Sequence, residues 1–129
     1  MIDTLITVVD DDDSVRKATS LLVESFGFRT AAFASAERFL GSDTLDETSC
    51  LILDLQLPGM NGLQLQSHLV VGGHHIPIIF ITAYDEKDSR QRAMQAGAVA
   101  FLSKPFSDEL LLQTVRAALR HDDEGTNSR

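Results

Sequence analysis

Five short runs of apolar, β-branched or aromatic residues recur along the chain, separated by longer mixed stretches. Runs of this length and composition are typical of β-strands. Three of them are continuously apolar, which indicates strands covered on both faces, as in a parallel sheet between helices. The predicted strands are LITVV at 5–9, RTAAF at 29–33, CLIL at 50–53, PIIFI at 77–81 and VAFL at 99–102.

The stretches between and after these runs carry helical patterns. From 14 to 26 the apolar residues recur on one stripe, Asp12 or Asp13 can cap the start, and Gly27 can end the helix. The remaining helices are predicted at 36–40, 63–70, 86–96 and from 107 or 108 to about 120.

Strands and helices therefore alternate as five successive βα units. Strict alternation with short connections predicts an α/β fold, in which a parallel sheet has helices on both faces and right-handed crossovers. The 129 residues suffice for one domain with a core and are too few for two. We expect this domain at 1–120, followed at 121–129 by a flexible tail or truncated linker without core-forming residues.

Net charge and cysteine content narrow the class of function. The net charge of −8 and the pI near 4.7 disfavour direct contact with nucleic acids or anionic membranes, so we expect neither as a partner. The longest apolar stretch, IPIIFI, is too short to span a bilayer. The single cysteine, Cys50, cannot form an internal disulfide, and no basic secretory signal opens the chain. These features favour the reducing cytoplasm.

The residues that follow the predicted strands are chemically distinctive. Asp10 and Asp11 follow the first strand, Asp54 the third and Thr82 the fourth, and Lys104 comes just after the fifth. The carboxyl ends of parallel strands meet at one edge of a sheet, where ligands bind. Three carboxylates beside one ammonium leave an excess of negative charge. A divalent cation with oxygen ligands would neutralise it, and Mg²⁺ suits such a site.

Asp54 is the strongest candidate nucleophile of this group. It ends a buried strand and precedes LQLPGMNG, whose proline and glycines favour an open turn. A carboxylate in such a site can accept a phosphoryl group as an acyl phosphate. Transfer requires that the equatorial oxygens be neutralised, which the cation, Lys104 and the Thr82 hydroxyl could do.

The acidic stretch at 10–13 does not match two other known kinds of ligand-binding loop. A calcium-binding loop starting at Asp10 would need a glycine where Val15 stands and a glutamate where Leu21 stands. No glycine-rich phosphate loop occurs anywhere in the chain. Asp12 and Asp13 are interpreted as solvated residues that cap the first helix, because a helix N-terminus favours negative charge.

Four segments together resemble a known family. VVDDD, LILDLQLPGMNG, IFITAY and FLSKPF, in this order and spacing, are similar to the receiver domain of two-component response regulators. The resemblance covers about residues 5–120. It implies a five-stranded parallel sheet of strand order 2-1-3-4-5, with helices on both faces, which is the flavodoxin-like receiver fold.

The resemblance also assigns the phosphoryl and metal chemistry. Asp54 matches the phosphoacceptor, charged by a sensor histidine kinase, a phosphotransfer protein or a small phosphodonor. Asp11 matches a direct ligand of Mg²⁺, for which Mn²⁺ can substitute. Asp10 matches an acid that binds the metal chiefly through water, and Asp54 and the backbone carbonyl of Gln56 match further ligands.

The same resemblance implies a conformational switch. Lys104 matches the lysine that contacts the phosphoryl group, and the Lys104–Pro105 peptide matches one that is cis in the family. Thr82 matches the hydroxyl that moves toward the phosphoryl group. Phe101 matches the aromatic residue that turns inward with it. The face formed by the fourth helix, fifth strand and fifth helix then changes its partner preference, and a phosphorylation-dependent homodimer through this face fits the family.

The segment AMQAGAVAFLSKPF is similar to regulators of the nitrogen-fixation type, in which a LuxR-like DNA-binding output domain follows the receiver. This chain contains no such domain, so it is either a fragment that ends in a linker or a stand-alone receiver. The resemblance thus implies a prokaryotic signalling switch, with transcription as its expected output. Such a switch assists its own aspartyl phosphorylation and dephosphorylation and is not counted as an enzyme.

Two alternatives belong to other functional classes. A haloacid-dehalogenase-like phosphatase also forms an aspartyl phosphate, but it needs an acid two residues after the nucleophile, where this chain has Gln56. A pseudo-receiver is a protein-interaction module that is not phosphorylated. It would lack one or more of the site residues, and this chain has all five at the strand ends.

Overall fold

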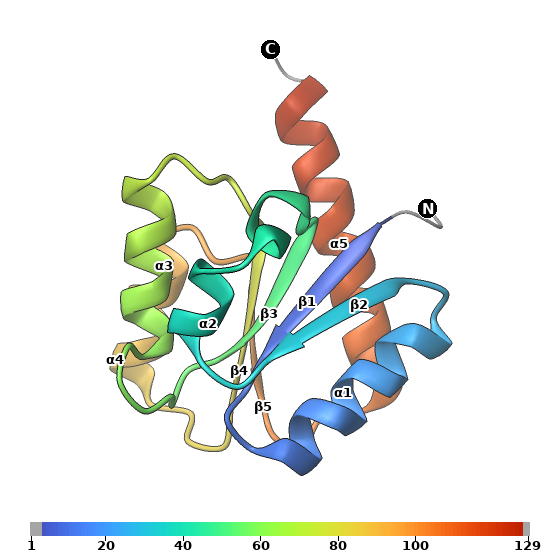
Figure 1. Ribbon diagram of the computed structural model, residues 1–129, viewed down its shortest axis with the longest axis horizontal. Helices are drawn as coiled ribbons and strands as arrows, with labels where there is room; N and C mark the ends of the chain where they lie inside the picture. Colours follow the sequence, from blue (N-terminus) through green and yellow to red (C-terminus); the bar gives the residue numbers. More distant parts are fainter. Residues whose placement is uncertain (1–3, 128–129) are drawn as a thin grey trace.

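The computed structural model describes residues 4–127, of which 121–127 are described by their backbone. Its core is one sheet of five parallel strands in the order β2-β1-β3-β4-β5 (Figure 1). The predicted α/β fold and strand order are therefore confirmed. The strands are β1 (Leu5–Val9), β2 (Arg29–Phe33), β3 (Cys50–Asp54), β4 (Ile78–Thr82) and β5 (Ala100–Ser103).

Helices cover both faces of this sheet. Residues of α1 and α5 pack in one apolar cluster, and residues of α2, α3 and α4 pack in a second cluster on the opposite face. The helices are α1 (Asp13–Ser25), α2 (Ala36–Leu40), α3 (Gly62–Val71), α4 (Lys87–Gln95) and α5 (Asp108–Asn127).

The central strands show why continuous apolar runs form such a sheet. In β3, Cys50 and Ile52 belong to the cluster beneath α1 and α5, whereas Leu51 and Leu53 belong to the cluster on the other face. Successive side chains of a strand point to opposite faces, so a strand covered on both sides needs apolar residues at every position. All four are fully buried.

Side-chain caps define where the helices begin. The Asp12 carboxylate accepts a hydrogen bond from the Val15 backbone N–H at 3.1 Å, which confirms its predicted role as cap of α1. Asn61 and Gln64 form a reciprocal capping box at the start of α3. These caps satisfy backbone donors that a helix leaves free at its start.

The predicted bounds agree with the structure to within one residue, except in two places. A 3₁₀ helix, η1 (Asp43–Glu47), lies in the stretch predicted as a connection between α2 and β3. Helix α5 continues to Asn127, beyond its predicted end near residue 120. The domain boundary at 120 stays a prediction, and residues 128–129 of the expected tail lie outside the described residues.

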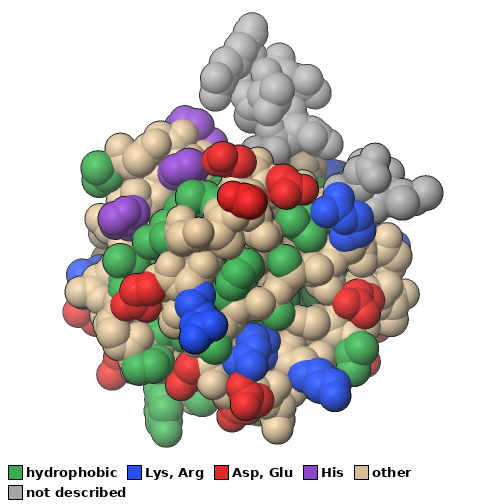
Figure 2. Space-filling model, in the orientation of Figure 1, with side chains coloured by type: hydrophobic (Ala, Val, Ile, Leu, Met, Phe, Trp, Pro, Cys, Tyr) green, Lys and Arg blue, Asp and Glu red, His purple; other side chains and the backbone are tan. Residues whose placement is uncertain are grey.

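The face shown in Figure 2 carries acidic and basic side chains interspersed with apolar ones. Among the residues whose side chains are described, the histidines gather over the upper end of α3, where His68 and His75 are exposed (Figure 2). Within residues 4–127, no helix is long and apolar enough to cross a membrane.

Candidate metal and phosphoacceptor site

Three carboxylates meet where β1 and β3 end. Val9 pairs with Leu53 in the parallel register, so Asp10 and Asp54 occupy matching positions one residue further along their strands. Asp10 is fully buried, Asp54 is 6% exposed, and Asp11 reaches the same place from the surface. One carboxylate oxygen from each of the three lies within 4.8 Å of the others.

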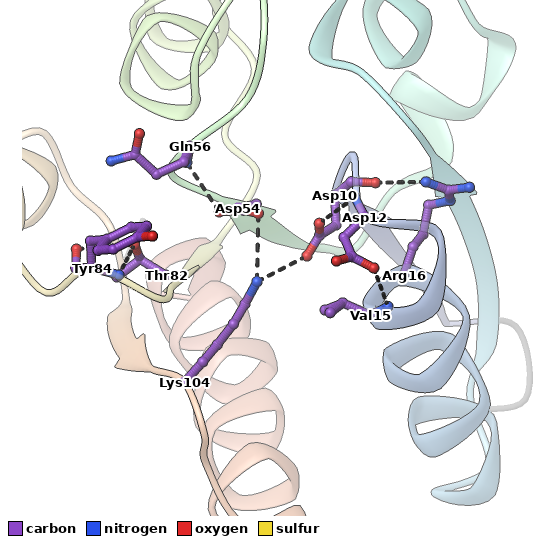
Figure 3. Close-up of polar contacts among 9 residues, drawn as sticks. All are labelled: Asp10, Asp12, Val15, Arg16, Asp54, Gln56, Thr82, Tyr84 and Lys104. Atoms are coloured by element: carbon purple, nitrogen blue, oxygen red, sulfur yellow. Dashed lines mark hydrogen bonds and ion pairs between the residues drawn. The ribbon is translucent and has the colours of Figure 1, made fainter.

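Lys104 forms ion pairs with two of these three acids. Its Nζ lies 3.3 Å from Oδ2 of Asp10 and 3.5 Å from Oδ2 of Asp54 (Figure 3). It follows β5, which is separated from β3 by β4, so the long side chain spans the width of a strand to reach the acids. Its peptide bond to Pro105 is cis, as the family resemblance implied.

The charge balance of the site leaves Asp54 poorly stabilised as an anion. Burial raises the pKa of Asp54 to about 6, and repulsion from Asp10 adds to the rise. The hydrogen bond from the Gln56 backbone N–H acts in the opposite direction and lowers this pKa. Lys104 lowers this pKa without compensating for burial. Oxygen donors in this number and charge suit a hard divalent cation, which would favour the ionised carboxylate.

The loop between β3 and α3 borders the site. The Gln56 N–H donates to Oδ1 of Asp54 at 3.0 Å, while the Gln56 side chain is exposed. The loop ends at Gly62, which is packed closely against the end of β3, since an added Cβ would lie 2.7 Å from the Asp54 carbonyl oxygen. From α2, Glu37 accepts a hydrogen bond from the Met60 N–H at 2.8 Å, and this bond lowers the pKa of Glu37. The loop is therefore held from both sides.

Thr82 ends β4 and Phe101 lies within β5, and both make their contacts with residues other than the three acids. The Thr82 hydroxyl accepts a hydrogen bond from the Tyr84 N–H at 3.0 Å and donates to the Tyr84 carbonyl at 3.1 Å. It is thus engaged by its own loop and not by Asp54 in the described structure (Figure 3). Phe101 is 5% exposed and contacts Phe80, with ring centroids 6.0 Å apart, while the Arg90 guanidinium lies 4.9 Å above its ring.

Two contacts around the site have little or no signal in the sequence. Arg16 contacts the turn that carries the acids, and its spacing from Asp13 is the only sequence signal for this contact, as an i,i+3 pair. Glu37 and Met60 are far apart in sequence, and no local pattern indicates their hydrogen bond. Sequence reasoning missed both Arg16 and Glu37.

The order of the strands reverses between β1 and β3, and the acids lie at the carboxyl ends of these two strands. This arrangement defines the class of protein, a receiver-like doubly wound α/β domain. The chain matches the family model of the response regulator receiver domain over residues 6–116, and it belongs to this family. The resemblance drawn from the four sequence segments is confirmed.

Curated relatives agree with this assignment. The chain is 48% identical over 118 residues to nodulation protein W of Bradyrhizobium diazoefficiens, covering 92% of this chain and 52% of that protein. It is 42% identical to the response regulator protein TmoT of Ectopseudomonas mendocina, covering 92% of this chain and 54% of that protein. The chain therefore spans about half the length of these relatives.

Solved structures show the same fold. The response regulator StyR superimposes with a TM-score of 0.89 at 39% identity, over 98% of this chain and 64% of that one. The FixJ-N crystal structure superimposes with a TM-score of 0.84 at 33% identity, over 94% of this chain and 97% of that one. This chain therefore matches nearly the whole length of the FixJ-N structure.

Proposed function

We propose that this chain is a phosphoacceptor domain that takes a phosphoryl group on Asp54 from a sensor histidine kinase or phosphotransfer protein, with Mg²⁺ as cofactor. The observation that carries the proposal is the buried Asp54 carboxylate, which lies beside two further acids and the Lys104 ammonium. Family membership supports it, because receiver domains are signalling switches that interact with histidine kinases. The assignment of roles to individual residues is part of the proposal.

In the proposed reaction, an oxygen of Asp54 attacks phosphorus while the bond from phosphorus to the donor nitrogen or oxygen breaks. Bound Mg²⁺, held by Asp10, Asp11, Asp54 and the Gln56 carbonyl, would supply positive charge to the phosphoryl oxygens. Lys104 contacts the same phosphoryl oxygens and gives up part of its ion pairing with Asp10 and Asp54 to do so. The charge that disfavours Asp54 as an anion is thereby balanced in the transition state.

The conformational response begins at Thr82. Its hydroxyl leaves the Tyr84 backbone and donates to a phosphoryl oxygen, so the loop after β4 loses two hydrogen bonds and rearranges. Phe101 repacks beneath α4, and the α4-β5-α5 face changes. Phosphate can shift this equilibrium only as far as its contacts differ between the two states.

The names of several relatives support a transcriptional output. Several of them, such as FixJ of Azorhizobium caulinodans, are named transcriptional regulatory proteins, so we propose that this receiver domain controls transcription through a DNA-binding output domain. A phosphorylation-dependent homodimer through α4, β5 and α5 is the proposed intermediate step. Sedimentation with and without a phosphoryl mimic checks it, and an unchanged monomeric mass would contradict it.

The direct test of phosphorylation is mass spectrometry. The wild-type chain and an Asp54→Ala variant are incubated with acetyl phosphate and Mg²⁺, and intact masses are taken. Gain of one phosphoryl group by the wild type alone supports the proposal. If folded wild-type protein binds Mg²⁺ and gains no mass with either acetyl phosphate or a phosphorylated histidine kinase, the pseudo-receiver interpretation replaces it.

A further inference from the structure

Arg16 holds the turn between β1 and α1 with two hydrogen bonds. One guanidinium nitrogen donates to the backbone carbonyl of Asp10 at 2.8 Å, and the other donates to the Asp13 carboxylate at 2.5 Å (the first is drawn in Figure 3). The side chain is 21% exposed, so it lies against the protein and does not extend into solvent. Its two contacts bracket residues 10–13, the segment that carries the acids.

The Asp10 carbonyl depends on this contact. Asp10 is fully buried; its N–H donates to the Phe33 carbonyl and its carboxylate is bonded by the Asp12 N–H and Lys104. Among the described residues, Arg16 supplies the hydrogen bond to the remaining backbone acceptor of Asp10. A buried carbonyl without a partner is costly, so loss of Arg16 favours a rearranged turn.

Asp11 has no comparable anchor. Its carboxylate is exposed, and among the described residues it makes no hydrogen bond or ion pair, yet one of its oxygens lies within 4.8 Å of Asp10 and Asp54. Like charges at this separation repel. The backbone of the turn must therefore direct Asp11 toward the other acids, and Arg16 holds that backbone.

We infer that Arg16 is a positioning residue for the divalent-cation site, acting through the turn on the carboxylate of Asp11. The inference rests on the proposed function, because it assumes that Mg²⁺ binds at the three acids. The direction of the change in Mg²⁺ affinity distinguishes this positioning role from a simple charge effect. Removal of a positive charge beside an acidic site should strengthen cation binding, whereas loss of the clamp should weaken it.

The test measures the Mg²⁺ dissociation constant of the metal-free 129-residue chain by isothermal titration calorimetry at pH 7.5. Arg16→Gln removes charge and clamp, and Arg16→Lys keeps the charge but cannot make both hydrogen bonds at once. Lys17→Gln is the matched control, since this exposed neighbour on α1 carries the same charge outside the clamp. We expect both Arg16 variants to raise the dissociation constant at least fivefold and Lys17→Gln to leave it unchanged or lower it.

A double-mutant cycle with Asp11→Asn separates positioning from general loosening of the fold. If Arg16 acts through Asp11, Arg16→Gln changes the dissociation constant less than twofold in the Asp11→Asn background. Equal effects in both backgrounds would overturn the inference, as would an Arg16→Gln or Arg16→Lys protein that binds Mg²⁺ like the wild type.

Circular dichroism in EDTA establishes that each variant is folded at the titration temperature. If the Arg16→Gln variant is not folded, the Mg²⁺ affinity of Arg16→Lys alone tests the inference. A wild-type chain that fails to bind Mg²⁺ would instead overturn the proposed function, so the two failures cannot be confused.

Discussion

Replacement of Asp54 by asparagine should stabilise the metal-free protein, and the gain should depend on pH. Burial raises the pKa of Asp54 from 3.8 to about 6. Above pH 6 the carboxyl is ionised in both the folded and unfolded chains, and the folded state carries the full cost of the buried charge. Below pH 3.8 it is neutral in both, and the cost disappears. Asparagine has nearly the same shape, keeps an acceptor for the Gln56 N–H, and never ionises.

The magnitude follows from the rise of the Asp54 pKa from 3.8 to about 6 on folding. At about 1.36 kcal/mol per unit, Asp54→Asn raises the free energy of unfolding by about 3 kcal/mol at pH 7.5. At pH 4.5 the unfolded carboxyl is mostly ionised while the folded one is mostly protonated, and the gain falls to about 1 kcal/mol. Saturating Mg²⁺ reduces the gain at pH 7.5, because the cation stabilises the ionised wild type.

Urea unfolding in EDTA, followed by circular dichroism at pH 7.5 and 4.5, measures both values. Asp46→Asn is the matched control, since Asp46 is exposed on η1, and its effect should be near zero at both pH values. A gain from Asp54→Asn that is equal at the two pH values, or no gain at pH 7.5, would refute the argument that burial of a charge destabilises this site.

Three further substitutions test the surroundings of the site. Gly62→Ala should lower the free energy of unfolding by about 1–3 kcal/mol in urea titrations, since its Cβ would meet the Asp54 carbonyl at 2.7 Å; an unchanged midpoint would contradict this packing. Arg90→Ala should cost about 1 kcal/mol in the same assay and broaden the NMR signals of Phe101, which loses the guanidinium above its ring; unchanged signals would deny the contact a role. We propose that the bulk of Tyr84, two residues past Thr82, restricts attacking water, so Tyr84→Ala should shorten the phosphoryl half-life; an unchanged half-life, measured by intact mass over time, would contradict this.

The sequence alone indicated most of the fold and the residues of the candidate site. The five apolar runs predicted the strands, because a strand buried on both faces needs apolar residues throughout. The acids, Thr82 and Lys104 could be placed at one edge, since parallel strands all end on the same side. The strand order, by contrast, came from the family resemblance and not from periodicity.

The detailed geometry required the tertiary structure. That the Thr82 hydroxyl is held by the Tyr84 backbone, and that Arg16 bonds the Asp10 carbonyl, depends on backbone positions that side-chain patterns do not encode. Glu37 and Met60 meet only because α2 and the loop after β3 pack on the same face of the sheet.

The elevated pKa of Asp54 has the same origin. A carboxylate after an apolar run is recognisable from sequence, but its burial and its distances from Asp10 and Lys104 are set by the strand order and register. The sequence by itself therefore determined which chemical groups line this edge of the sheet. Only the folded chain decided how closely they approach and how far water is excluded, and those two quantities set the strength of every charge interaction in the site.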